Sequence, residues 1–330
     1  ALLEDALAQL RPRLDASRAE LLRLEQRLAD LLGQQGEWAG ARELQARVLA
    51  AWEAIGGPRH PDALAAAASL ALIDTRSGEL ARARALQERV LGDSRELRGP
   101  NDPETLTVAR HLASTLYAQG ELAAARALQT ENVAGLTQTL GAKHMETLLA
   151  RAELAHTLQE LGLLGEAEAE LLPALAAFTG QLPADHRILI DLRSAEALLR
   201  LRQGRLAEAR GLLATLLPLA QHKHGPHSVS VAFLGMTLGQ ALHDAGAAGE
   251  AVPVLHESLA LLERLLPDDV NTIACAMLLA TTIVKARGEP ALARAVLTRA
   301  SELVRQFAGE GSPLLTTIAE LVVSLGLQAS

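Results

Sequence analysis

The chain has 330 residues, a formal net charge of −8 at pH 7 and one cysteine, Cys275. No block of basic residues is present to neutralise a phosphate backbone, so we expect no nucleic-acid partner. A lone cysteine excludes an internal disulfide, and no apolar run is long enough to span a bilayer, so we expect no membrane insertion of this chain.

Hydrophobic residues make up 49% of the chain, but aromatic residues make up only 2%. The apolar side chains are therefore mostly Leu, Ala, Val and Ile. Because Leu and Ala favour helices, whereas sheets are enriched in β-branched and aromatic residues, the composition predicts an all-α fold.

The first segment, residues 1–14 (ALLEDALAQLRPRL), is predicted to form an N-terminal entry or capping helix. It lacks the basic and then apolar pattern of a signal peptide. Because the chain starts at Ala1 and not at Met, we expect a fragment or a processed product. The compartment stays undetermined; we favour the cytoplasm, and an extracytoplasmic sensor domain is the alternative.

Residues 15–312 contain one octet seven times. The copies are QGEWAGAR, SGELARAR, QGELAAAR, LGLLGEAE, QGRLAEAR, AGAAGEAV and RGEPALAR. Their shared glycines are 42 residues apart, at Gly36, Gly78, Gly120, Gly162, Gly204, Gly246 and Gly288. Five residues after each glycine stands an alanine: Ala41, Ala83, Ala125, Ala167, Ala209, Ala251 and Ala293. A fixed period of this length is typical of stacked structural repeats.

The third repeat shows what one unit contains. Asp102 and Pro103 are a good N-cap and first helical residue, so a first helix (helix A) is predicted to start there. Its apolar residues follow at helical spacing up to Leu116. Gly120 then closes helix A in the left-handed conformation, and a second helix (helix B) runs to Gly141. Ala125 is small because the two helices of the pair lie close together beside it.

The same pattern predicts seven tandem helix pairs over 15–312 and a C-terminal capping helix over 313–330. A single pair cannot bury its own apolar face, so consecutive pairs must stack. His60, His144 and His186 occupy one position in three connectors, so we interpret them as turn or capping residues.

This pattern resembles the tetratricopeptide repeat. The resemblance rests on Leu and a small residue in helix A, as in Leu112 and Ala113, and on the seven alanines of helix B. The 42-residue period and connectors such as GPRHPDAL are similar to the kinesin-light-chain subclass, which also occurs in bacterial signalling proteins. The resemblance implies a right-handed superhelix, or solenoid, of antiparallel helix pairs. It covers nearly the whole chain.

The chain departs from that subclass in helix A. The subclass has paired asparagines nine and ten residues before the turn glycine, which hold a peptide backbone. Here these places carry other residues, such as Arg110 and His111. The lysines and asparagines of chaperone carboxylate clamps are also absent, so binding of that kind is not expected.

In such superhelices helix A lines a concave groove, and the resemblance therefore implies a set of partner-binding residues. They are Arg110, Ser114, Tyr117, His156, Gln159, Glu160, Asp191, Ser194, Phe233, Met236, Gln240 and His243. Aromatic anchors flanked by polar groups suit a peptide or a protein loop. The alternative is that each of these residues simply lies on a solvated helix face and contacts no partner. Self-association through the terminal helices is the other contact that we consider.

Repeat five carries Glu196 and Arg200 at helix A positions where other repeats place leucine. Either they form a buried ion pair, or the helix rotates to pack another set of residues, Leu192, Ala195, Leu199 and Leu201. We predict rotation, because burying two charges is costly even when they are paired. Asp74 in repeat two is a similar case, and we expect it to cap the helix or to pair locally with Arg76.

Catalytic and metal-binding patterns are absent from the sequence. Three nearby histidines, His222, His224 and His227, lack cysteine or spaced carboxylate partners, so we interpret them as part of a solvated loop. No phosphate-binding, dinucleotide-binding or nucleophile-elbow motif is present. Cys275 lies in an apolar stretch that would raise its pKa. We therefore expect that the chain is not an enzyme and that it binds no metal and no cofactor.

The function that follows is a non-catalytic interaction module, which binds a protein or peptide segment in its groove. We expect it to be the sensor or scaffold part of a larger bacterial signalling protein. The alternative is the target-recognition arm of a multidomain effector, such as a STAND-type NTPase or a caspase-like protease.

Overall fold

The structure, a computed structural model, describes residues 18–327. The helix predicted over 1–14 lies outside these residues. The helix predicted over 313–330 ends at Ser324, and only positions 328–330 of that prediction lie outside the described residues. The described residues form fifteen α-helices and no strands. In chain order they are α2 (Arg18–Gln34), α3 (Trp38–Gly56), α4 (Pro61–Arg76), α5 (Leu80–Arg98), α6 (Pro103–Ala118), α7 (Leu122–Leu140), α8 (Met145–Glu160), α9 (Leu164–Thr179), α10 (Arg187–Arg202), α11 (Leu206–His224), α12 (Val229–Asp244), α13 (Ala248–Leu265), α14 (Val270–Lys285), α15 (Pro290–Ala308) and α16 (Pro313–Ser324). The all-α prediction is confirmed.

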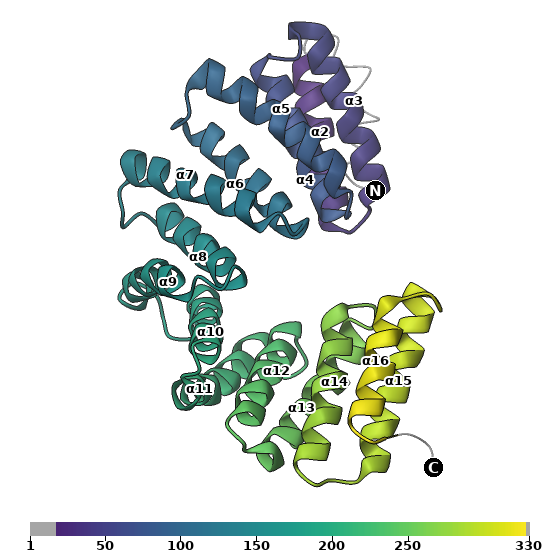
Figure 1. Cartoon of the computed structure of the whole chain (residues 1–330). Helices are drawn as coiled ribbons and strands as arrows, with labels where there is room; N and C mark the ends of the chain where they lie inside the picture. The colour runs from purple at the N-terminus through teal and green to yellow at the C-terminus, as the bar shows by residue number, and fades with distance from the viewer. Residues whose placement is uncertain (1–17, 328–330) are drawn as a thin grey trace. The chain divides into compact units, whose positions relative to one another are not determined.

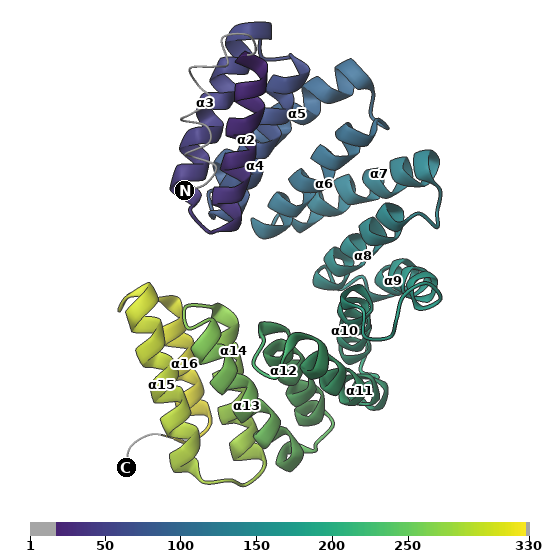
Figure 2. The same ribbon diagram turned by 180° about the vertical axis from the view of Figure 1, so that it is seen from behind.

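The chain divides into two units, Ala1–Leu163 and Leu164–Ser330. Unit 1 contains α2 to α8, and unit 2 contains α9 to α16 (Figures 1 and 2). Within each unit every helix packs against the next one along the chain, which is the contact pattern of a solenoid. None of the described helices is both long and apolar enough to cross a membrane.

The A helices come closer to one another than the B helices do. In unit 1, α4 contacts both α2 and α6, and in unit 2, α12 contacts both α10 and α14. The B helices between them show no contacts of similar extent. Within each unit the A helices therefore line the inner side of the curve, and we call their solvent-facing side the helix-A surface.

Helix A begins with a side-chain cap. Asp102 accepts hydrogen bonds from the backbone N–H groups of Glu104 and Thr105, and Pro103 follows as the first helical residue. The three connector histidines cap their helices in the same way. In each of them, Nδ1 accepts a hydrogen bond at 3.3 Å from the backbone N–H two residues later; they are His60, His144 and His186. Their predicted capping role is confirmed.

Left-handed backbone residues join helix A to helix B. Gly120 has a φ of +80°, and the N–H of the next residue donates to the Leu116 carbonyl at 2.9 Å. Five further turn glycines, Gly36, Gly78, Gly162, Gly204 and Gly246, have φ between +74° and +84°. Glycine is preferred here because a Cβ atom is penalised in this conformation.

The seventh turn differs from the prediction by one residue. Gly288 does not have a positive φ; Arg287 does, at +57°. The N–H of Gly288 donates to the Ile283 carbonyl, as the residue after the turn glycine does elsewhere. Because α13 has 18 residues where α11 has 19, helix A of this repeat starts one residue early. In this seventh repeat, helix B therefore starts 42 residues after the preceding helix B, whereas helix A starts one residue earlier than the 42-residue period predicts.

The alanine after each turn lies at the crossing of a helix pair. All seven, from Ala41 to Ala293, are 0% exposed. A larger side chain there would collide with the partner helix, and this close approach explains the strict choice of alanine.

Helix α10 contradicts the predicted rotation. Arg200 is only 5% exposed, and its guanidinium pairs with Glu168 on α9 and with Glu196 at 3.3 Å. The buried ion pair is therefore the correct alternative. The guanidinium of Arg200 has several N–H donors and can therefore bind two carboxylates. Glu168, which the sequence did not indicate, supplies the second carboxylate and so lowers the cost of burying the charge of Arg200.

Asp74 forms the matching pair in unit 1. It is 1% exposed and accepts from Arg42 of α3 at 2.8 Å, so the predicted partner Arg76 is wrong. Asp74 and Arg200 are both the fourteenth residue of their helix A, and Arg42 and Glu168 are both the fifth residue of the preceding helix B. The two units therefore contain the same inter-repeat ion pair with its charges exchanged.

Candidate functional site

The residues predicted to bind a partner all lie on A helices. Unit 1 supplies those on α6 and α8, from Arg110 to Glu160, and unit 2 supplies those on α10 and α12, from Asp191 to His243. Each unit is described separately below.

In unit 1 two predicted aromatic residues contact each other. Tyr117 Oη and His156 Nε2 are 2.8 Å apart, and the two ring centroids are 5.2 Å apart. Tyr117 is half-buried and His156 is exposed. The two rings, tilted by 40° to each other, form an aromatic contact across the joint between repeats three and four, on the same helices as exposed Ser114 and Glu160.

Arg110 is held by a residue that the sequence analysis missed. Its Nη1 lies 3.4 Å from Oε1 of Glu153 on α8. Burial raises the pKa of Glu153, and Arg110 opposes that shift. Glu153 follows Arg110 by 43 residues, close to one period. A search for opposite charges about one period apart would have found this pair.

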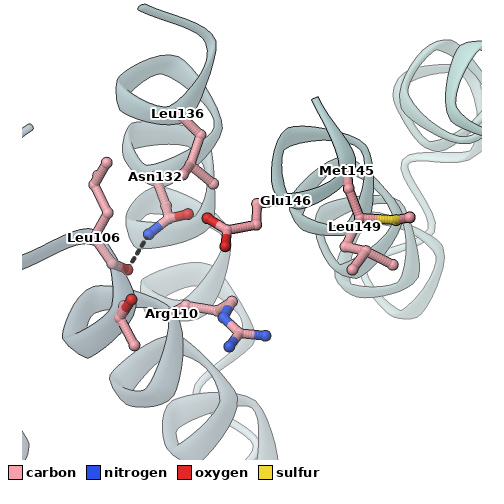
Figure 3. A pocket seen from close by; sticks show the side chains of 8 residues that line it. Leu106, Arg110, Asn132, Leu136, Met145, Glu146 and Leu149 are labelled. Atoms are coloured by element: carbon pink, nitrogen blue, oxygen red, sulfur yellow. Dashed lines mark hydrogen bonds between the residues drawn. The ribbon is translucent and has the colours of Figure 1, made fainter. Parts of the chain in front are cut away.

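Beside Arg110 lies a cavity of about 340 Å³ between α6, α7 and α8 (Figure 3). Its lining residues are Leu106, Thr107, Arg110, Asn132, Leu136, Met145, Glu146 and Leu149. Half of these lining residues are apolar, and of the polar ones Arg110 and Glu146 are exposed and charged. Of the residues predicted to bind a partner, only Arg110 takes part.

Unit 2 has an equivalent hollow of about 230 Å³ between α10 and α12. Three predicted residues line it together, Asp191, Ser194 and Phe233. Asp191 and Ser194 occupy the same helix A positions as Thr107 and Arg110, and Phe233 occupies the position of Leu149. Both units are therefore hollowed between neighbouring A helices at partly equivalent positions, although the hollow of unit 1 is also lined by α7.

Asp191 is an exposed carboxylate at the edge of this hollow, with a side chain that is 60% exposed. Burial raises its pKa, and Arg187, whose Nε is 3.7 Å away, lowers it in part. Ser194 donates to the Ile190 carbonyl at 2.6 Å, which fixes its side chain against its own helix.

Several predicted residues are engaged inside the protein. Gln159 is only 1% exposed and so lies beneath the surface. The Nδ1 of His243 is 2.8 Å from Thr282 Oγ1, and burial lowers the pKa of this histidine. Gln240 donates to Asp244 at 2.8 Å, and Met236 is half-buried. The exposed part of the predicted site is therefore smaller than the sequence indicated.

The thiol of the single cysteine is inaccessible. Cys275 is 0% exposed, and burial raises its pKa to about 12. Among the described residues no three His, Cys, Asp or Glu side chains gather in a way that could hold a metal ion.

Comparison with known proteins gives matches in sequence and in structure. Residues 17–96 and 64–137 match the family model described as tetratricopeptide repeat. No curated protein matches the sequence. The nearly identical TPR-like repeats of a candidate kinesin light chain from Podosopora anserina superpose with a TM-score of 0.56 and 26% identity, covering 62% of this chain and 96% of that one.

Two other structures match over nearly the full chain at lower identity. The apo form of the quorum sensor NprR from B. thuringiensis gives a TM-score of 0.69 at 12% identity, covering 98% of this chain and 88% of that chain. A Rap protein complexed with Competence and Sporulation Factor gives a TM-score of 0.60 at 11% identity, covering 98% of this chain and 92% of that chain. These two likenesses concern the fold alone.

Proposed function

The chain is a tetratricopeptide-repeat array of kinesin-light-chain-like type, and from this premise we propose that it is a non-catalytic module that binds a protein or peptide segment along its helix-A surface. We further propose that it serves as the sensor or scaffold part of a larger bacterial signalling protein. The quorum sensor NprR and the Rap protein crystallised with its factor have the same fold.

One observation carries the proposal: each unit has a hollow between neighbouring A helices that is lined in part by residues at equivalent helix positions. Each hollow combines apolar walls with charged or polar groups at its rim. An extended segment can place an apolar side chain in such a hollow, while flanking polar groups fix its register. The aromatic pair of Tyr117 and His156 adds contact area at low entropic cost, because aromatic side chains have few rotatable bonds.

The test begins with selection of peptides that bind the full chain from a displayed random library. Affinity is then measured by fluorescence anisotropy for four variants, Arg110→Glu, Tyr117→Ala, Asp191→Arg and Phe233→Ala. Truncating an aromatic anchor typically weakens binding by at least tenfold, so we expect a loss of that order for Phe233→Ala, which lines the hollow of unit 2, and for Tyr117→Ala, which removes the aromatic contact beside His156.

Arg89→Glu is the matched control for Arg110→Glu. Arg89 on α5 pairs with Glu53 on α3 at 3.0 Å, so it also links two repeats, but through B helices. Both arginines have similar exposure, 38% and 43%. If Arg89→Glu weakens binding and the four helix-A variants do not, the proposed surface is wrong.

A further inference from the structure

The A helices of repeats six and seven lack charged side chains. Helix α12 has no Asp, Glu, Lys or Arg before its last residue, Asp244, and α14 has none before its last residue, Lys285. The A helices α6, α8 and α10 carry charged residues within the helix, such as Arg110, Glu153 and Asp191. A helix with one solvent-facing side normally places charged residues there, so exposure to water alone does not explain the composition of α12 and α14.

Apolar side chains take the place of these charges. Helices α12 and α14 contact each other, and the residues at positions one, five and eight of each helix share one face because their spacing follows the helical period. We call this set the α12–α14 patch; it consists of Val229, Phe233, Met236, Val270, Ala274 and Met277. Val270 is 57% exposed, Val229 and Ala274 are also exposed, and the other three are half-buried. Exposed apolar area that includes two of the chain's three methionines, which are adaptable side chains, is typical of a protein-binding surface.

The polar side chains beside the patch already donate their hydrogen bonds within their own helices. Thr237 and Thr281 each donate to the backbone carbonyl four residues earlier, at 2.9 Å and 2.8 Å. Gln240 donates to Asp244 at 2.8 Å. An extended backbone on this surface would therefore bury N–H and C=O groups with few partners, whereas a helix pairs these groups internally. The patch therefore suits a helical segment better than an extended one.

Carboxylates flank the patch on both sides. Asp191 on α10 and Glu320 on α16 lie on the A helices before and after the patch, at positions five and eight, which are positions that the patch also uses. Both are exposed, and no cation among the described residues pairs with Glu320. Two cations near the helix ends are already engaged, because Arg187 lies 3.7 Å from Asp191 and Lys285 Nζ donates to a backbone carbonyl of α12 at 2.7 Å. The flanks therefore favour a basic partner.

We propose that the α12–α14 patch binds an amphipathic helix of the partner, which lays its apolar face on the patch and places lysine or arginine residues beside Asp191 and Glu320. The proposal rests on the proposed function, because it specifies the form and the charge of the segment that unit 2 binds. Neighbouring helix axes lie about 8–10 Å apart, so the three steps from α10 to α16 span roughly 30 Å, which is the length of a helix of about 20 residues.

The probe is a synthetic peptide of about 20 residues with leucines along one helical face, lysines only in its first and last turns, and alanine and glutamine elsewhere. One matched control carries glutamate in place of lysine, and the other has the same residues in a scrambled, non-amphipathic order. Fluorescence anisotropy measures the affinity of each for the full chain, and circular dichroism measures the helix content of the bound peptide. We expect the lysine peptide to bind at least about tenfold more tightly than either control, and its advantage over the glutamate peptide to shrink as salt is added.

The three methionines of the chain locate the bound peptide. The methyl NMR signals of Met236 and Met277 should move on binding, whereas that of Met145 on α8 should not. Replacing both patch methionines with alanine, the residue that α4 has at the same position as Ala68, should weaken binding at least about tenfold. Met145→Ala is the control and should leave the affinity unchanged. Thermal denaturation checks that both variants are folded.

A second pair of variants tests the charges. Glu320→Lys should reduce the preference for the lysine peptide over the glutamate peptide, because it removes one flanking carboxylate. Glu257→Lys is its control, since Glu257 is an exposed carboxylate on the B helix α13 of the same unit. This control should leave the preference unchanged.

Equal affinities for the lysine and glutamate peptides, a peptide that stays unfolded when bound, or unchanged Met236 and Met277 signals at saturation would each overturn the proposal. Movement of these two signals with protein concentration alone, or on addition of phosphatidylcholine vesicles, would assign the patch to a second copy or to a lipid surface and overturn it too. A library peptide that binds in an extended form and depends on Tyr117 would then leave the proposed function standing. Loss of every helix-A dependence, with neither methionine signal moving, would refute both.

Discussion

At the residue scale, the glycine of the turn and a glycine inside a helix have opposite effects on stability. Gly120 has a φ of +80°, whereas Gly92 lies inside α5 and a Cβ added to it would meet no atom within 4 Å. We expect Gly120→Ala to lower the free energy of unfolding by about 1 kcal/mol and Gly92→Ala to raise it by about 0.5–1 kcal/mol. Urea denaturation of the two variants measures both changes. Two changes of the same sign would contradict this interpretation of the turn.

His111 makes stability depend on pH. Burial lowers its pKa below the ordinary value of 6.5, and Arg110 and Arg76 lower it further. The unfolded chain therefore binds the proton at a higher pH than the folded chain does. We expect the free energy of unfolding to fall as the pH drops through 6.5 and to level off below the pKa of the folded state.

His111→Gln should reduce this slope in denaturation experiments at a series of pH values. An NMR titration of the imidazole provides the direct check. A midpoint for His111 above 6.5 would remove the physical basis of the prediction.

At the scale of helices, the exchanged ion pairs provide an internal test of inter-repeat packing. Arg42→Glu alone leaves two carboxylates facing each other at this joint, and Asp74→Arg alone leaves two guanidinium groups facing each other. Because Arg42 is 40% exposed although Asp74 is buried, each single variant should cost less than the about 3–5 kcal/mol typical of a fully buried pair. The double variant recreates the charge order of Glu168 and Arg200 and should unfold within about 1 kcal/mol of the original chain.

The control for this exchange is the exposed pair of Arg95 and Glu131, which lie 2.8 Å apart on α5 and α7. Breaking it should cost less than about 1 kcal/mol, because solvent screens exposed ion pairs. A double exchange at Arg42 and Asp74 that is no more stable than the single variants would show that the two joints pack differently.

At the scale of the whole molecule, stability is expected to be local. Within each unit the helices contact only their near neighbours along the chain, as in a one-dimensional array. We expect Asp74→Arg to increase amide hydrogen exchange in α3, α4 and α5, and to leave α14 and α15 protected as before. Uniform loss of protection would mean that the chain unfolds as one cooperative body.

The helix pairs, their turns and their caps were predictable from the residue pattern. These features depend on residues within a few positions of one another, such as Asp102 with Thr105 or Gly120 with Leu116, so seven copies of the same local pattern were enough. The close helix crossing at Ala125 was also predictable, because its small size is imposed in every repeat.

The side-chain contacts between repeats became known from the packed helices and not from the residue pattern. The pairing of Arg200 with Glu168, of Arg110 with Glu153 and the unpaired Oδ1 of Asn132 depend on how far one helix slides along the next. A single-residue shift, like the one that moved the seventh turn to Arg287, changes these contacts without altering the period of the helix B pattern. Local propensity fixes the elements, whereas contacts between residues about one period apart are fixed by packing.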